Sequence, residues 1–285
     1  MDRRAALSLS PAACPLALVL AGLGLTVAQS FGFFLPVPAA GGRFDGYAAL
    51  LAPHLVASFA FSALVALASV LLSLACGTLI AWRIWQLSPK LKPLALVYKV
   101  PLILPHIAVA FIVLIVFSGS GVLASAGHAL GLVATPADFP AILFSGNGLG
   151  LILAYALKET PFVTLMVLAL LARLDPRLVQ AARMLGASGT RVFFTIAVPH
   201  VRPALEASGI ILFLYAFGAY DIPALLSESS PGMLSITVFD LIFQRDLALR
   251  PRAMALLVVM FLFAAAFIWA YVRLAARLSS RERKL

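Results

Sequence analysis

Lys158 and Glu159 stand side by side inside an otherwise apolar stretch, "LAYALKETPF". A buried ammonium or carboxylate can carry a proton, meet a solute of opposite charge, or take part in a structural ion pair. Neighbours on a helix point about 100° apart, so these two side chains do not neutralise each other along one face. We expect each to find its own partner on another helix, in a water-filled cavity or on a solute. Pro161 should kink the same helix, because it frees the carbonyl of Leu157.

A further charged residue, Asp221 in "FGAYDIPALL", lies near the end of another apolar stretch. Pro223 should interrupt the helix there, and a carboxylate beside freed backbone groups is typical of the broken helices that line transport cavities. The alternative is that Asp221 only caps a turn and that Tyr215 and Tyr220 are aromatic residues of a membrane interface. The residues selected as candidates for solute contact are Tyr155, Lys158, Glu159, Tyr220 and Asp221.

Metal chemistry and nucleophilic catalysis find no support in the sequence. It contains neither an H-E-x-x-H nor a G-x-S-x-G pattern. The four histidines are scattered over loops and the ends of apolar stretches without metal-ligand spacing: His54, His106, His128 and His200. We therefore expect no catalytic residue and no metal site, and we do not expect an enzyme.

The elements that carry the charged residues are predicted to be membrane-spanning helices. Of the 285 residues 63% are hydrophobic and only 11% are charged, too few to form a water-facing surface. A hydrocarbon core of roughly 30 Å is crossed by about 20 apolar helical residues. Six stretches are long enough, at about 13–35, 55–81, 95–117, 148–172, 204–226 and 252–275. The expected fold is an all-α membrane protein with one transmembrane domain over residues 1–285.

The first apolar stretch has the features of a signal peptide as well as those of a span. Arg3 and Arg4 precede it and "TVAQS" resembles a cleavage site, so a cleaved signal peptide is the alternative to a first span. Cys14 would suit a lipoprotein, but the apolar residues before it are few and are interrupted by serines. Cys14 and Cys76 both lie in or beside apolar stretches, so we expect them to be packing residues.

Lysine and arginine are distributed unevenly among the loops, and this distribution predicts the orientation of the chain in the membrane. The formal net charge is +10, and sixteen of the 21 lysines and arginines lie at the two ends of the chain, after the second stretch, or between the fourth and fifth. The alternate loops hold only Arg43, Arg245, Arg250 and Arg252. Cytoplasmic loops of membrane proteins carry the excess of positive charge, so we expect both termini in the cytoplasm. This distribution accounts for the charge without nucleic acid as a partner.

The cytoplasmic loop 175–200 begins with the signals of a short helix. Asp175 can cap it, and Pro176 suits the first helical position. One apolar stripe follows at helical spacing, formed by Leu178, Ala181, Ala182 and Leu185. Gly186 then offers a left-handed stop.

A second helix is expected directly after this stop. Ser188 can cap it, and its apolar face would contain Val192, Phe193 and Ile196. Pro199 and Pro203 should then redirect the chain into the fifth span. Such a helix–turn–helix either packs under the membrane helices with its arginines on lipid head groups, or forms a rigid knob that another protein grips.

These residues resemble the permease subunits of type I, binding-protein-dependent ABC importers. The cytoplasmic signature of that family is E-A-A, three residues, G, nine residues, then I-x-L-P. The matching positions are Gln180, Ala181, Ala182, Gly186, Ile196 and Pro199. Two positions depart, because Gln180 replaces the glutamate and Val198 the leucine, and the first change puts any salt bridge of that glutamate in doubt. The six-span layout and "FLYAFGAYDIPALL" are also similar to the family.

The resemblance implies partners. In such importers the short helix, here with Leu185 at its end, docks in a cleft of an ABC ATPase subunit, whose closure moves the permease between inward-open and outward-open states. A second permease subunit, identical or homologous, and an extracytoplasmic solute-binding protein complete the assembly in the bacterial cytoplasmic membrane. The sequence contains no G-x-x-x-x-G-K-[ST] phosphate loop, so the ATP would be bound by the partner and this chain needs no cofactor.

The transported solute stays open. The resemblance points towards permeases for polyamines, ferric iron, sulfate-like anions, thiamine or phosphonates. Carboxylates near the outer face would suit a cation, whereas Lys158 would suit an anion. Two other classes compete: a secondary transporter that couples solute to protons through Lys158, Glu159 and Asp221, and a structural assembly subunit, which needs neither the charges nor the loop.

Overall fold

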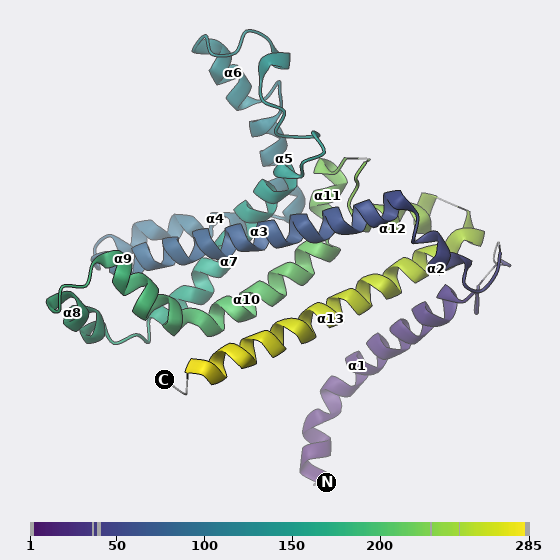
Figure 1. Ribbon diagram of the computed structural model, residues 1–285, viewed down its shortest axis with the longest axis horizontal. Coiled ribbons are helices and arrows are strands. Elements are labelled where there is room, and N and C mark those ends of the chain that lie inside the picture. The colour runs from purple at the N-terminus through teal and green to yellow at the C-terminus, as the bar shows by residue number, and fades with distance from the viewer. Residues whose placement is uncertain (1–2, 36, 39–40, 229, 245, 283–285) are drawn as a thin grey trace. The chain divides into compact units, whose positions relative to one another are not determined.

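The computed structural model describes residues 3–35, 37–38, 41–228, 230–244 and 246–282 (Figure 1). Within these residues the chain is helical without strands, and six helical segments are long and apolar enough to cross a membrane. The six-helix expectation is therefore confirmed. Arg245 lies outside the described residues. The chain divides into two compact units, Met1–Ala57 with Ile236–Ala270 and Ser58–Ser235 with Tyr271–Leu285.

The first unit is built mainly from the two ends of the chain. Its helices are α1 (Arg3–Ser30), α2 (Asp45–Ala49), most of α13 (Arg250–Glu282) and the short turns η4 (Asp240–Gln244) and η5 (Leu247–Leu249). The apolar parts of α1 and α13 are the first and last candidate spans, Ala13–Ser30 and Leu247–Arg273. Large apolar side chains of α1, such as Leu18 and Val19, are exposed, as expected for a helix that faces lipid or another subunit.

The second unit contains the four central spans. Its elements are most of α3 (Pro53–Gln86), η1 (Lys92–Lys99), α4 (Val100–Ile103), α5 (His106–Phe117), α6 (Val122–Ala129), η2 (Pro136–Asp138), α7 (Leu149–Leu171), α8 (Pro176–Met184), α9 (Gly189–Val192), η3 (Phe193–Ala197), α10 (Val198–Gly218), α11 (Asp221–Leu226) and the start of α12 (Leu234–Phe239). Helix α7 packs against α5, α10 and α11 and carries much of the buried core.

A glycine allows α3 and α7 to approach each other closely. A Cβ atom on Gly77 would lie 2.6 Å from Cβ of Val163 and 2.9 Å from the carbonyl oxygen of Thr160, so only glycine fits. The hydroxyl of Thr164 donates to the carbonyl of Thr160 at 2.9 Å and lies 3.3 Å from that of Gly77. This contact lies beside Pro161, and α7 continues through that proline from Leu149 to Leu171.

The third apolar stretch differs from its predicted extent of 95–117. The chain is helical through η1 and α4, then breaks at Leu104 and Pro105, both extended with ψ of 137° and 152°, before α5 begins at His106. A residue that precedes proline avoids the helical region, and proline itself lacks a backbone donor. Pro101 and Pro105 therefore bracket a break that hydropathy alone does not reveal.

The expected redirection at Pro199 and Pro203 is wrong. The helical segment runs without interruption from Gly189 to Gly218, through the π-helical turn η3 and into α10. A π turn widens the helix locally, which gives the ring of Pro199 room and tolerates its missing donor. The second half of the loop is thus a direct extension of the fifth span.

Candidate functional site

The short helix of the loop 175–200 begins and ends as its sequence predicts. Oδ1 of Asp175 accepts a hydrogen bond from the backbone N–H of Arg177 at 2.9 Å, and Pro176 opens α8. Gly186 has a φ of +84°, a left-handed conformation that side chains with a Cβ rarely adopt. Ser188 then accepts from the N–H of Arg191 at 3.3 Å. The helix and its glycine turn are therefore confirmed in detail.

The apolar residues of α8 point mostly into open space. Leu178 is 55% exposed, and Met184 and Leu185 are each 89% exposed. Gln180 and Ala181 are also exposed and Ala182 is half-buried, whereas Val179 is buried. Exposed leucine and methionine side chains on one short helix are typical of a surface that a partner covers.

The other half of the loop is firmly attached to the second unit. Val192 and Phe193 are buried, and the Phe193 ring lies 5.8 Å from that of Trp82 on α3. Trp82 in turn stacks on Trp85 at 5.3 Å. Ile196 is half-buried and Pro199 is exposed.

A hydrogen bond fixes the loop to α7 as well. Nε2 of His200 lies 3.0 Å from the carbonyl oxygen of Leu170, near the end of that helix. Together with the aromatic contacts on α3, this bond attaches the base of the loop to two helices. The exposed helix α8 is therefore mounted on a rigid support.

The ammonium group of Lys158 forms all three of its hydrogen bonds with the chain itself. Its Nζ donates to the carbonyl oxygens of Pro101, Leu102 and Leu104 at 2.9, 3.2 and 2.6 Å. These carbonyls lie at the end of α4 and at the break before α5. The side chain is only 9% exposed, so the ammonium replaces water as the donor for backbone groups that the broken helix leaves without partners.

Glu159 has a different partner, as the angular separation of neighbours predicts. Its Oε2 accepts from the hydroxyl of Ser73 on α3 at 3.3 Å, and the side chain is 3% exposed. Oε1 is buried without a hydrogen-bond partner among the described residues. Lys158 and Glu159 thus connect α7 to two different neighbours, and they form no ion pair with each other within the described chain.

Tyr155 lies within electrostatic reach of both Glu159 and Asp221, and His106 and Tyr215 lie in the same neighbourhood. Tyr155 is fully buried, with its ring 6.4 Å from that of Tyr215, and both hydroxyls lack a partner among the described residues. Tyr220 and Asp221 are exposed at the start of α11. The chain is interrupted between α10 and α11, as predicted, and Asp221 begins the second helix without a side-chain cap bond.

Sequence reasoning missed several residues of these arrangements. Ser73 and Trp82 lie on α3 in an apolar run that shows no local signal. The carbonyls that surround Lys158 belong to a segment 54 to 57 residues away. The pair of prolines at 101 and 105 is the one local hint, because a break in a membrane helix needs a donor from elsewhere.

Comparisons with known proteins agree with the fold. Residues 73–280 match the family described as "Binding-protein-dependent transport system inner membrane component". The molybdenum transport permease ModB of Escherichia coli K12 is 28% identical over 165 residues, which cover 58% of this chain and 68% of that protein. The spermidine/putrescine permease PotB of Salmonella typhimurium SL1344 is 30% identical over 183 residues, covering 64% of this chain and 62% of PotB.

A solved structure extends the agreement over nearly the whole chain. A bacterial alginate ABC transporter, crystallised with a periplasmic protein bound to an alginate pentasaccharide, superposes with a TM-score of 0.74 at 19% identity and covers 98% of this chain and 95% of its own. These relatives do not favour a proton-coupled carrier. The chain belongs to the inner-membrane component family of binding-protein-dependent transport systems and is a multi-pass permease subunit of an ABC importer.

Proposed function

We propose that α8 is the contact through which a separate ABC ATPase drives this permease. The observation that carries the proposal is the combination of exposed apolar side chains with a rigid mount. Leu178, Met184 and Leu185 face open space, while the turns on either side of them are capped and Phe193 is held by Trp82. A force on α8 would therefore move the helices behind it rather than bend the loop.

The proposed contact is mainly apolar. Gln180 stands where the family signature has glutamate, so this chain offers no carboxylate there. Burial of apolar surface contributes roughly 25 cal/mol per Å², and Leu178, Met184 and Leu185 supply most of the apolar surface that α8 exposes. A partner cleft lined by apolar side chains would fit this face.

The proposed assembly places both termini in the cytoplasm and the α8 loop on the same side, in accordance with the distribution of lysine and arginine. ATP is bound by the ATPase subunits, and this chain contributes no cofactor site. A second permease subunit, identical or homologous, forms the translocation path with this one. A solute-binding protein delivers the solute on the outer side.

The solute in this proposal is small and is not bound by Lys158. That ammonium donates to three backbone carbonyls and would have to abandon them to meet an anion. The relatives named above transport molybdenum in one case and spermidine or putrescine in the other, so the family accommodates solutes of different charge. We assign Lys158 to the support of the broken third span and Glu159 to the contact between α7 and α3.

A matched pair of leucine variants tests the proposed contact. Leu185→Ser removes an 89% exposed side chain from α8, and Leu132→Ser removes a 78% exposed one between α6 and η2. We expect Leu185→Ser to weaken binding of the ATPase subunit roughly tenfold in a pull-down from membranes. The Leu132→Ser chain should retain the ATPase at the wild-type level. Equal retention by both variants would refute the assignment of α8.

A further inference from the structure

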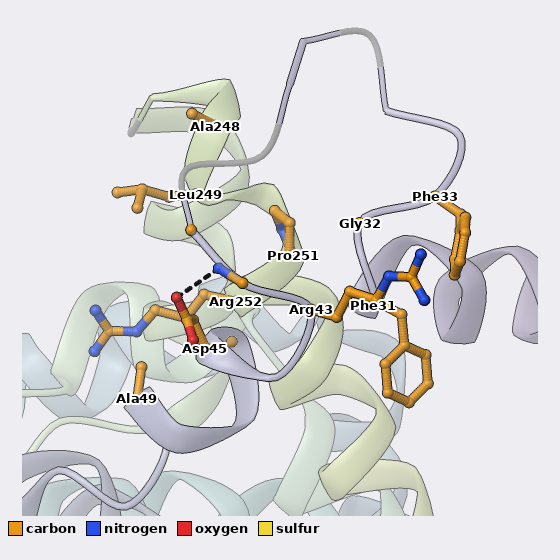
Figure 2. Close-up of a pocket in the computed structure, with 13 residues that line it drawn as sticks. Phe31, Gly32, Phe33, Arg43, Asp45, Ala49, Ala248, Leu249, Pro251 and Arg252 are labelled. Carbon is orange, nitrogen blue, oxygen red and sulfur yellow. Dashed lines mark hydrogen bonds between the residues drawn. The ribbon is translucent and has the colours of Figure 1, made fainter.

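A cavity of about 430 Å³ in the first unit has charged walls that do not converge on one ligand (Figure 2). The carboxylate of Asp45 accepts from the backbone N–H of Gly42 at 2.6 Å. Figure 2 shows the guanidinium groups of Arg43 and Arg252 extending in opposite directions. The charges of this cavity are therefore arranged for the chain itself rather than for a bound group.

A groove of about 420 Å³ in the second unit has the opposite character. It runs between α3, α5, α7 and the segment formed by η1 and α4. Helix α3 contributes Leu72, Cys76 and Ile80, and the η1–α4 segment contributes Tyr98 and Pro101. The facing wall is the α7 stretch 153–164, without the charged side chains at 158 and 159.

The walls of the groove are apolar and partly open to the surroundings. Most lining side chains are aliphatic or aromatic, and the hydroxyl of Thr164 is engaged with the carbonyl oxygen of Thr160 at 2.9 Å. Leu72 and Ile80 are 38% and 37% exposed. Such walls offer little to a hydrated or charged solute, and they suit a hydrocarbon chain.

The length of the groove matches one leaflet of a membrane. Its walls extend over residues 72–80 of α3 and 153–164 of α7. At a rise of 1.5 Å per residue these stretches are roughly 12 and 16 Å long. Half of a hydrocarbon core of roughly 30 Å is about 15 Å. The groove is therefore as long as the acyl region of a single leaflet.

Two cationic side chains lie at the end of the groove that η1 forms. Nζ of Lys99 lies 5.9 Å from the centre of the Tyr98 ring, which lines the groove. Arg83 continues the α3 stripe, because Cys76, Ile80 and Arg83 follow at intervals of four and three residues on one helix face. Arg83 and Lys99 are exposed, and neither forms an ion pair within the described part of the chain.

Aromatic residues place this basic end at the surface of the membrane. Trp82 and Trp85 flank Arg83 and stack on each other at 5.3 Å, and Tyr98 precedes Lys99. Tryptophan and tyrosine are enriched at the level of the lipid head groups. The apolar groove thus ends in a basic rim, Arg83 and Lys99, at the depth of the lipid phosphates.

We propose that this groove binds an acyl chain of an anionic phospholipid from the cytoplasmic leaflet, with the lipid phosphate at Arg83 and Lys99. The inference rests on the proposed function for its orientation, which places the basic rim on the cytoplasmic side. The cytoplasmic leaflet carries anionic lipid, and basic pockets between membrane helices on that side bind anionic head groups.

A second copy of the permease is the competing occupant, and the charges disfavour it. An identical chain carries the same formal net charge of +10 and has its own basic loops at the same depth. Two basic rims repel each other, whereas a phosphate attracts both cations of one rim.

A bound acyl chain would also support the broken third span. It would contact Tyr98 and Pro101 on one side and α3 and α7 on the other. Lys158 already joins α7 to the same segment through the carbonyls of Pro101 and Leu102. The lipid would therefore act with Lys158 in holding η1 and α4 against α7.

The test uses the importer purified with its partner subunits in detergent. The complex is mixed with equal amounts of phosphatidylglycerol and phosphatidylcholine that have identical acyl chains, and native mass spectrometry measures the lipid retained. We expect wild type to retain roughly tenfold more phosphatidylglycerol than phosphatidylcholine. Equal retention of the two lipids by wild type would overturn the proposal.

Charge variants test the basic rim. The double variant Arg83→Gln, Lys99→Gln should retain the two lipids equally, because the phosphate loses both cations. The matched control is Arg173→Gln, Arg191→Gln, which removes two exposed arginines from the loop between the fourth and fifth spans. The control should keep the wild-type preference. An equal loss of preference in both double variants indicates general attraction of anionic lipid and contradicts a site at the groove.

A pair of tryptophan variants tests the groove itself. Ile80→Trp fills the groove and should lower retention of phosphatidylglycerol roughly tenfold. Leu79→Trp adds the same ring at a neighbouring position that is 51% exposed and does not line the groove, so retention should stay at the wild-type level. If the Ile80→Trp chain does not assemble, Ile80→Phe replaces it, with a smaller loss expected. Wild-type retention by the groove-filling variant would refute the proposal.

Two outcomes distinguish this inference from its alternatives. If the permease chain alone retains phosphatidylglycerol and the complete importer does not, another subunit covers the groove and the lipid proposal fails. The measurement needs no solute, ATP or transport, so it is independent of the α8 contact. Selective retention by an importer whose ATPase is not released by Leu185→Ser supports the lipid site and rejects the proposed role of α8.

Discussion

Helices α7 and α8 both depart from the usual distribution of side chains, in which charged residues are exposed and apolar residues are buried. α7 buries the charged residues Lys158 and Glu159 in the middle of a span, and α8 exposes Leu178, Met184 and Leu185 to open space. Three carbonyls accept from Lys158. Ser73 donates to one carboxylate oxygen of Glu159, and the other oxygen is buried without a partner among the described residues. The exposed apolar side chains of α8 are left uncovered by the described residues.

This difference separates structural residues from interaction residues. A charge in a membrane helix suggests a solute or proton site by default, yet here the chain satisfies Lys158 by itself. An apolar residue on a short loop helix suggests little by default, yet here its exposure calls for a partner. Which groups stay unsatisfied therefore indicates function better than residue type does.

The largest effect is expected from Gly186→Val, which tests whether the glycine turn after α8 is needed for transport. Gly186 adopts a φ of +84° with no atom within 4 Å of an added Cβ, so the cost is conformational rather than steric crowding. The left-handed region costs about 2 kcal/mol or more for a β-branched residue, so the turn should reorganise and misplace α8. We expect the complex to assemble while solute uptake by cells fails.

Gly189→Val is its control. Gly189 lies three residues further on, has open space around an added Cβ, and adopts no positive φ. Uptake by the Gly189→Val strain should remain near wild type. Wild-type uptake in the Gly186→Val strain would show that the glycine turn does not transmit the motion.

Lys158→Met tests the structural role assigned to the buried lysine of α7, and we expect it to lower the stability of the chain. Three backbone carbonyls lose a charged donor, which we expect to cost about 2 to 4 kcal/mol. The apparent Tm of the purified chain in detergent should fall by several degrees. Lys99→Met, which changes an exposed lysine, should leave it almost unchanged.

The double variant shows whether Lys158 and Glu159 act as a pair. They contact different groups in the structure, so the Tm changes of Lys158→Met and Glu159→Gln should add. A double variant that is more stable than Lys158→Met alone would reveal a direct interaction. That result would contradict the separate roles assigned to the two residues.

Cysteine labelling perturbs the chain least. It tests the orientation of the chain in the membrane, on which the interpretations of both α7 and α8 depend. Thr190, in the α8 loop, and Ser125, on α6, are exposed and make no capping bond. Single cysteines there, in a background without Cys14 and Cys76, should react with an impermeant maleimide from opposite sides of the membrane. Labelling of both positions from one side would contradict the six-span topology.

Local signals allowed much of this fold to be predicted. Long apolar runs indicate spans whatever they pack against, and the capping roles of Asp175, Ser188 and Gly186 depend only on neighbouring residues. Pro199 misled the prediction, because a π turn inside a continuous helix accommodates a proline and the sequence alone does not distinguish that turn from a helix end.

Partners that lie far apart in the chain could not be predicted. Lys158 donates to the carbonyls of residues 101, 102 and 104, and backbone oxygens leave no trace in residue types. Such juxtapositions depend on helix packing, which hydropathy and periodicity do not specify.

The central claim, that a partner supplies the energy through α8, is tested most directly by uptake into proteoliposomes. One set contains the purified chain alone with an imposed pH gradient, and the other contains the complete importer with solute-binding protein outside and ATP inside. We predict uptake only in the second set, and its loss with Leu185→Ser. Gradient-driven uptake by the purified chain without ATP would contradict the account.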